Sequence, residues 1–112
     1  MSKPYRGQYT ITWVEDDFGI DPADDNVDVV VRFEGGERFV ATFFTLENLR
    51  SLMEQYNETG ECMNGLYVWS SHMIVIARLT RENVERAVAD LIESDEFDAA
   101  FEGPVTDEEP MM

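Results

Sequence analysis

The sequence predicts an α+β domain: an antiparallel sheet of four to five strands with two amphipathic helices packed on one face. Three observations support this class. Short segments alternate apolar and polar residues, which is typical of half-buried strands. Two other segments repeat apolar residues at helical spacing. The chain of 112 residues, 44% of them hydrophobic, is long enough to bury one core. We therefore expect a single domain at residues 1–103 and a disordered acidic tail at residues 104–112.

The predicted element order is β-loop-β-β-α-β(β)-α. In the first strand, over residues 8–14, Tyr9, Ile11 and Trp13 share one face. Glycine and an Asp-Pro pair then interrupt the chain, so residues 16–25 are expected to form an exposed loop.

A hairpin follows, because residues 27–33 and 39–43 alternate on either side of two glycines. A three-residue loop of residues 35–37 places Glu34 opposite Arg38, whereas a two-residue loop places two glutamates opposite each other. Opposite charges stabilise a cross-strand pair and like charges destabilise it, so the three-residue loop is the predicted one.

Each of the two predicted helices begins after a threonine that can cap its first turn. Thr45 precedes the first helix and Thr80 the second. Between them, residues 66–79 have a strand-like pattern, and the sequence leaves open whether Ser70-Ser71-His72 is a tight turn between two short strands or the middle of one long strand. The apolar stripes are Leu46, Leu49, Leu52, Met53 and Tyr56 in the first helix, and Val84, Ala87, Val88, Leu91 and Ile92 in the second.

Acidic residues dominate the charge and gather in two stretches. The chain has 24 acidic and 8 basic side chains, a formal net charge of −16. Residues 15–28 hold seven carboxylates and residues 87–112 hold nine, with no Lys or Arg in either stretch. Such a field repels nucleic acid and anionic membranes and attracts basic surfaces. We therefore expect a basic protein as partner, with no direct nucleic-acid or membrane contact.

Catalysis and metal binding have little support in the sequence. Cys62 and His72 are the sole cysteine and histidine, and no fixed spacing marks them as a nucleophile and its base. Asp24, Asn26 and Asp28 match the start of a calcium loop, but that loop then requires a glycine and a glutamate at positions that hold valine and glycine here. We predict no catalytic residue, no metal site and no cofactor, and hence no enzyme.

The candidate partner-binding residues combine the acids with three aromatic side chains. Phe97 and Phe101 stand four residues apart and share one face of a helical turn, so they either anchor a partner or pack on the sheet. Of the two tryptophans, Trp13 is expected in the core, and Trp69 is the better candidate for an exposed aromatic side chain. The hypothesis requires both acidic stretches to converge on one face; otherwise their charge only solvates the protein. The candidates are Glu15, Asp16, Asp17, Asp21, Asp24, Asp25, Trp69, Asp95, Glu96, Phe97, Asp98 and Phe101.

In size and charge the chain resembles small acidic α+β bacterial proteins, namely toxin-immunity proteins and other proteinaceous inhibitors. No motif carries this likeness, and it transfers no functional residues. It implies an inhibitor that binds a basic protein such as a nuclease toxin. The alternatives are a DNA mimic of the anti-restriction or anti-CRISPR type, a small Cys/His enzyme, and a structural domain whose acidity serves solubility.

The first residues lack the apolar run of a signal peptide, so the expected location is the cytoplasm. The sequence leaves the oligomeric state open, with a homodimer as one alternative.

Overall fold

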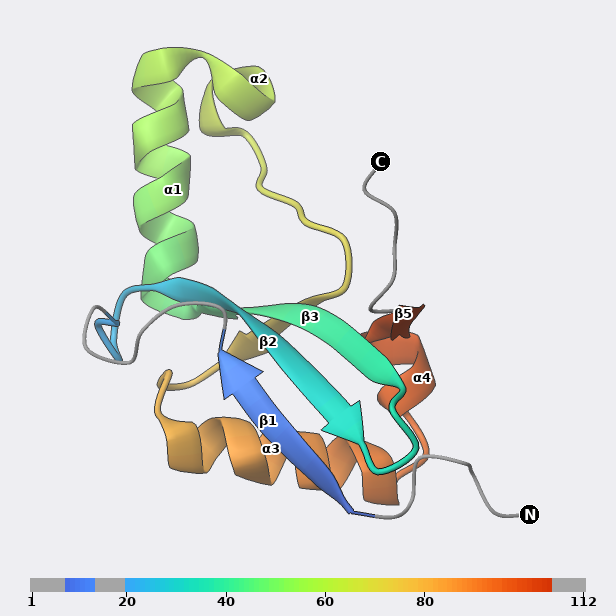
Figure 1. Ribbon diagram of the computed structural model, residues 1–112. Helices are drawn as coiled ribbons and strands as arrows, with labels where there is room; N and C mark the ends of the chain where they lie inside the picture. Colours follow the sequence, from blue (N-terminus) through green and yellow to red (C-terminus); the bar gives the residue numbers. More distant parts are fainter. Residues whose placement is uncertain (1–7, 14–19, 106–112) are drawn as a thin grey trace.

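The computed structural model describes residues 8–13 and 20–105. Helices and strands follow one another in the order β1, β2, β3, α1, α2, β4, α3, α4 and β5 (Figure 1). The strands are β1 (Tyr9–Trp13), β2 (Asn26–Phe33), β3 (Arg38–Thr45), β4 (Met73–Ile76) and β5 (Glu102–Val105). The helices are α1 (Leu46–Thr59), α2 (Glu61–Gly65), α3 (Arg81–Glu93) and α4 (Phe97–Ala100).

The strands form one five-stranded sheet, which confirms the α+β prediction. Their order is β1-β2-β3-β4, and β5 also pairs with β3. The predicted antiparallel pairing holds for β1, β2, β3 and β5, whereas β4 runs parallel to β3. The chain passes through α1 and α2 between these two strands, and a crossover of this length allows the parallel direction.

The β2–β3 hairpin has the predicted three-residue loop, but the loop begins one residue earlier. The Phe33 N–H donates to the Glu37 carbonyl at 2.9 Å, which leaves residues 34–36 in the loop. Gly36, the last of them, has a φ of 99°. Glycine adopts this left-handed conformation without strain, whereas the predicted loop would impose it on Glu37. The register moves by two residues, so each side chain keeps its predicted face.

The core lies between the sheet and α3. Val29 and Val31 of β2 are fully buried, as are Val84 and Val88 of α3. Their spacing is two along the strand and four along the helix, which places each pair on one face of its element. Figure 1 shows α3 running along one side of the sheet, with α4 at its end.

Both predicted helix caps are confirmed. The Thr45 hydroxyl accepts a hydrogen bond from the Asn48 N–H at 3.1 Å, and the Thr80 hydroxyl accepts one from the Asn83 N–H at 3.2 Å. These bonds satisfy backbone donors that the first helical turn leaves without a partner. Gly60 ends α1 with a φ of 92°, a conformation common at helix C-termini.

The first helix does not cover the core face of the sheet as predicted. None of its residues is buried, and within the described residues the core and the side chains packed on it include none from α1. Figure 1 shows α1 rising from the side of the sheet opposite α3. The core face is already covered by α3 and α4, so the apolar stripe of α1 stays partly exposed. We call residues 46–72 the arm.

A single helical turn, α2, closes the arm. Cys62, Met63 and Asn64 have left-handed backbone conformations, with φ of 49°, 55° and 62°. Gly65 follows with a φ of 83°, and a Cβ atom there would fall on the Met53 carbonyl of α1, well inside van der Waals contact. The close approach of α2 to α1 therefore requires glycine at position 65.

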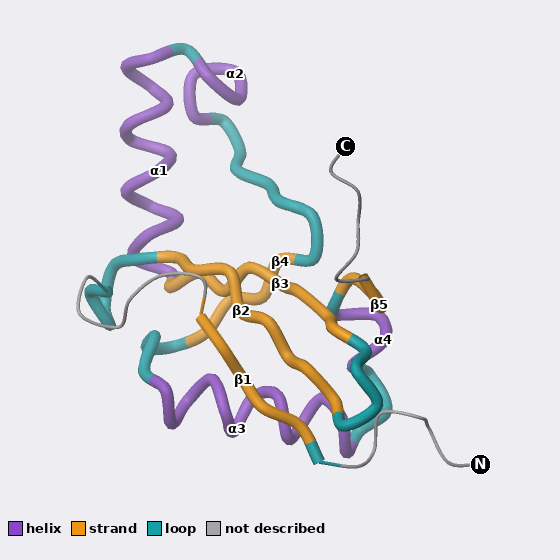
Figure 2. The backbone as a smooth tube through the Cα atoms, in the orientation of Figure 1, coloured by secondary structure: helices purple, strands orange, loops and turns teal. Residues whose placement is uncertain are grey.

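The strand-like stretch of residues 66–79 forms only one short strand, β4. Ser71 and His72 form a turn before it, and His72 has a φ of 52°. The predicted turn is therefore present, but the short strand expected before it is not. Residues 66–70 lead from α2 back to the sheet as a loop (Figure 2).

At the other end, β5 extends the folded part to Val105, beyond the boundary predicted at residue 103. The described part of the chain contains no helix with the length and apolar character needed to cross a membrane.

We predict that Gly65→Ala loosens the arm. The added methyl group meets the α1 backbone and also strains the left-handed conformation. Gly36→Ala is the matched control, because its φ is also positive but no atom lies within 4 Å of the added Cβ. Urea unfolding should show a loss of about 1 kcal/mol for the control and a larger loss for Gly65→Ala. Equal losses would contradict the proposed close packing.

Candidate protein-docking surface

Two acids predicted as partner contacts bond within the fold. The Asp24 carboxylate accepts hydrogen bonds from the Asn48 amide and the Ser51 hydroxyl of α1, each at 3.2 Å. The Asp25 carboxylate accepts one from the backbone N–H of Asp21 at 3.0 Å. Asp24 and Asp25 are partly buried, while Asp21 is exposed. The Asp24 carboxylate thus ties the loop before β2 to α1, whereas the Asp25 carboxylate bonds within the loop itself.

The Thr45 hydroxyl joins the same loop to the end of β3. It accepts from the backbone N–H of Asp25 at 3.2 Å as well as from that of Asn48. The Thr45 N–H in turn donates to the Asp25 carbonyl at 3.1 Å. Thr45 is only 1% exposed, so these polar groups have little access to water and depend on one another.

The acids of the second stretch are exposed but lie far from the first. Asp95 and Glu96 directly precede α4 and Asp98 lies in its first turn, and all three are exposed. Asp25 directly precedes Asn26, the first residue of β2. The ring of Phe97 in α4 contacts that of Phe33, the last residue of β2. The eight residues of β2 span about 23 Å, and Figure 1 shows the two regions at opposite ends of the strand. The described acids therefore do not form the single compact face that we expected.

Glu15, Asp16 and Asp17, the remaining candidates of the first stretch, lie outside the described residues.

Phe97 and Phe101 belong to the core and cannot anchor a partner. Their exposed fractions are 0% and 2%. The two rings stack on each other with centroids 4.4 Å apart, and Phe97 also meets Phe33 and Phe39 edge to face, at 5.7 and 5.1 Å. Aromatic pairs in these geometries stabilise a core beyond the area they bury. Of the two alternatives for these residues, packing on the sheet is correct.

The large apolar side chains that stay exposed come from one part of the chain. In the described structure all of them lie between residues 46 and 75, on the arm and on β4. Trp69, predicted as an exposed aromatic, is 69% exposed. Where exposed apolar side chains form a patch, the patch usually marks an interaction site, so this stretch of the chain is the candidate docking surface. The residues are Leu46, Met53, Met63, Leu66, Tyr67, Trp69 and Val75.

Carboxylates accompany these apolar side chains. Glu47, Glu54, Glu58 and Glu61 are all exposed on α1 and α2. Arg50 is the single Lys or Arg of the arm. The arm thus presents apolar side chains in a negative field, a combination suited to a partner with an apolar contact region and basic surroundings.

Sequence reasoning finds Trp69 but misses the rest of this surface. Leu46 and Met53 are part of a stripe with the same helical spacing as that of α3, and this spacing predicts packing on the sheet. The spacing does not indicate which of the two helices packs on the core face of the sheet. The strand-like pattern of residues 66–70 likewise predicts a half-buried strand, so it gives no sign that Leu66 and Tyr67 are exposed.

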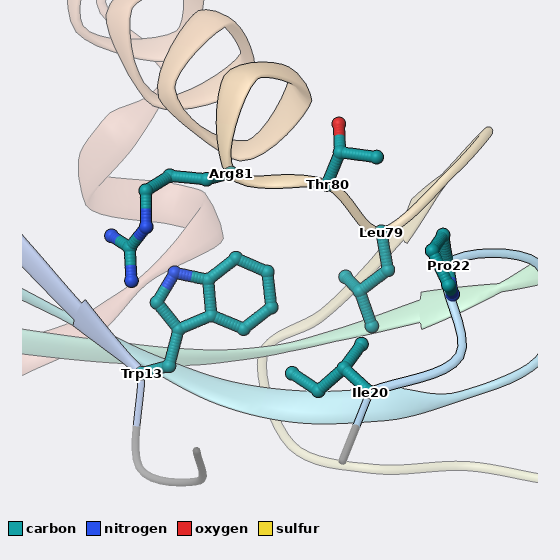
Figure 3. A pocket seen from close by; sticks show the side chains of 6 residues that line it. All are labelled: Trp13, Ile20, Pro22, Leu79, Thr80 and Arg81. Carbon is teal, nitrogen blue, oxygen red and sulfur yellow. The ribbon is translucent and has the colours of Figure 1, made fainter. Parts of the chain in front are cut away.

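A small cavity lies where β1, the loop before β2 and the start of α3 meet (Figure 3). It encloses about 180 Å³, below the range of about 300–1,000 Å³ typical of ligand pockets. Among the described residues the buried Trp13 Nε1 has no hydrogen-bond partner, and the Arg81 guanidinium lies 5.3 Å from the centre of the indole ring. Arg81 also donates to the Ile11 carbonyl at 3.5 Å. This cavity is too small to define a ligand site.

The sole histidine and cysteine lie in different surroundings. Cys62 is part of α2, whereas His72 Nδ1 lies 3.0 Å from the Ser71 hydroxyl and 3.8 Å from the Glu102 carboxylate. Among the described residues, no group of three or more His, Cys, Asp or Glu side chains is placed to hold a metal ion. Comparisons with protein-family models, curated proteins and solved structures found no match to this chain.

We predict that Thr45→Val destabilises the protein more than Thr80→Val. Both substitutions remove a helix cap, which costs about 1 kcal/mol. Only Thr45 also bonds the loop before β2, so its loss leaves the partly buried Asp25 N–H without this partner, at about 1 kcal/mol more. Equal free energies of unfolding for the two variants would show that the loop contact is unimportant.

Proposed function

We propose that this protein is an acidic protein-binding inhibitor that docks on a basic partner through the arm. The observation that carries the proposal is the concentration of exposed apolar side chains between residues 46 and 75. A binding surface needs apolar groups that lose water on contact, and Trp69 and Leu66 are large enough to act as such anchors. The arm also projects from the sheet (Figure 1), a shape that can enter a concave site.

Charge identifies the kind of partner. With a net charge of −16, the protein attracts cationic surfaces from a distance and repels other acidic proteins. The arm acids around the apolar side chains then favour a partner with basic residues near the contact. A nuclease or another nucleic-acid-binding protein has such a surface, because it must attract phosphates. Within this class, the proposed function is that of a toxin-immunity protein directed against a nuclease.

The proposal predicts that the arm determines binding. Immobilised protein should capture a cationic protein from cells, and with that protein purified, Leu66→Ser combined with Trp69→Ser should weaken the Kd about tenfold or more. The Kd of the unaltered protein should rise between about 0.05 and 0.5 M salt. A Kd that changes neither with the arm substitution nor with the salt concentration would contradict the proposal.

A matched pair of charge variants separates the arm from overall charge. Glu54→Gln with Glu58→Gln neutralises two arm acids, and Glu82→Gln with Glu85→Gln neutralises two acids on α3. Only the first pair should slow association clearly if the arm docks. Equal effects would assign the attraction to overall charge. Competition by duplex DNA for the partner would place the contact on its nucleic-acid site, as expected of a nuclease inhibitor or a DNA mimic.

A further inference from the structure

The edge of the sheet on the side of β3 away from β2 is formed by β4 together with β5. Among the described residues, the outward backbone groups of β4 pair with no further strand. The Thr42 N–H of β3 donates to the His72 carbonyl at 3.1 Å, and the parallel register pairs Thr42 with Met73. Backbone groups of successive strand residues point to alternate sides. His72 and Ile74 therefore bond toward β3, and the N–H and C=O groups of Met73 and Val75 point away from it.

This edge differs from the one at the other side of the sheet. On β1, Arg81 donates to the outward carbonyl of Ile11 and so covers part of that edge. On β4, the sequence from Met73 to Ile76 contains no charge and no proline, and Val75 is 52% exposed. Proteins usually protect an edge strand with charges, proline or a covering segment. Because residues 73–76 carry neither a charge nor a proline, this apolar edge is suited to pairing with another strand.

A groove lies beside the end of β4, along α3. It has a volume of about 620 Å³ and is lined by Ile76 and Ala77 and by α3 residues that include Arg86, Asp90 and Glu93. Ile76 and Ile74 point toward the α3 side of the sheet, since both pack on the core. A strand added to β4 would place every second side chain over this groove, whose lining includes two carboxylates and one guanidinium.

We propose that β4 binds an extended cationic segment of the partner as an additional strand of the sheet. Side chains of that segment facing α3 would be lysine or arginine, paired with Asp90 and Glu93. The alternate side chains would be apolar and would contact Val75. This inference rests on the proposed function and adds to it the way in which the basic partner is held.

Charge favours this occupant over a second copy of the chain. Two β4 strands paired about a two-fold axis would bring the grooves of both copies toward one interface, each with two carboxylates, Asp90 and Glu93, against one guanidinium, that of Arg86. Like charges brought together in this way oppose association. A cationic segment removes this repulsion and supplies the same backbone hydrogen bonds.

The test uses a short peptide that alternates lysine and valine, with binding followed by fluorescence anisotropy. It should bind the intact protein, and methylation of its backbone nitrogens should weaken the Kd at least about tenfold, because the peptide keeps its charge but cannot donate. A peptide alternating glutamate and valine should not bind. Equal binding of the methylated or the glutamate peptide would overturn the inference.

Val75→Pro tests the same edge from the protein side. Proline removes an N–H that points away from β3, so the pairing of β3 with β4 is kept. Val75→Thr is the control, since it retains the N–H and the branched side chain. Peptide binding should be lost in Val75→Pro and kept in Val75→Thr. If Val75→Pro fails to fold, the methylated peptide still decides.

The outcomes separate this inference from the proposed function. If the captured partner binds Val75→Pro as well as it binds the intact protein but is lost by the arm variant, the edge inference fails and the proposed function stands. If the peptide binds the edge while the partner binds the arm variant as tightly as the intact protein, only the proposed function fails. A dimer that dissociates in Val75→Pro would show that a second copy occupies the edge, and would overturn the inference.

Discussion

The buried hydroxyl of Thr45 occupies the point on which the arrangement of this molecule depends. Thr45 ends β3, the strand that bonds to β2, β4 and β5, and it caps α1. The same hydroxyl binds the backbone of Asp25, so the loop before β2 is held at the base of the helix. Asp24 adds two hydrogen bonds to α1. Together these contacts fix where α1 starts and lead it away from the face that α3 covers. The exposed arm is a consequence of this junction.

Local signals predicted much of this fold because their causes lie within a few residues. A threonine before a helical stripe identifies both caps, and alternation identifies β1, β2 and β3. The predicted hairpin loop begins one residue late because cross-strand charge is a weaker constraint than the positive φ that Gly36 satisfies. The placement of α1 could not be predicted from its stripe. The stripe alone would assign to the first helix the part of the core that Phe97 and Phe101 occupy. Which element packs there depends on the packing of the whole chain, which a local sequence pattern does not contain.

The acids of this chain have at least two roles. Asp24 and Asp25 act inside the structure as hydrogen-bond acceptors, whereas the acids around α4 and along the arm face the solvent. The separation of the two acidic stretches along β2 argues against a single charged face. Charge then acts as a long-range attraction to the partner, and apolar side chains make the short-range contact. In this account Trp69 and its neighbours provide affinity, and the carboxylates determine which partners approach.

Amide hydrogen exchange with and without the captured basic partner tests this division most directly. The account predicts slower exchange on binding across the arm, at residues 46–72, and at β4, with little change around Asp95 and Glu96. Protection confined to the acidic segments near residues 21–28 and 95–102, with unchanged exchange in the arm, would contradict it.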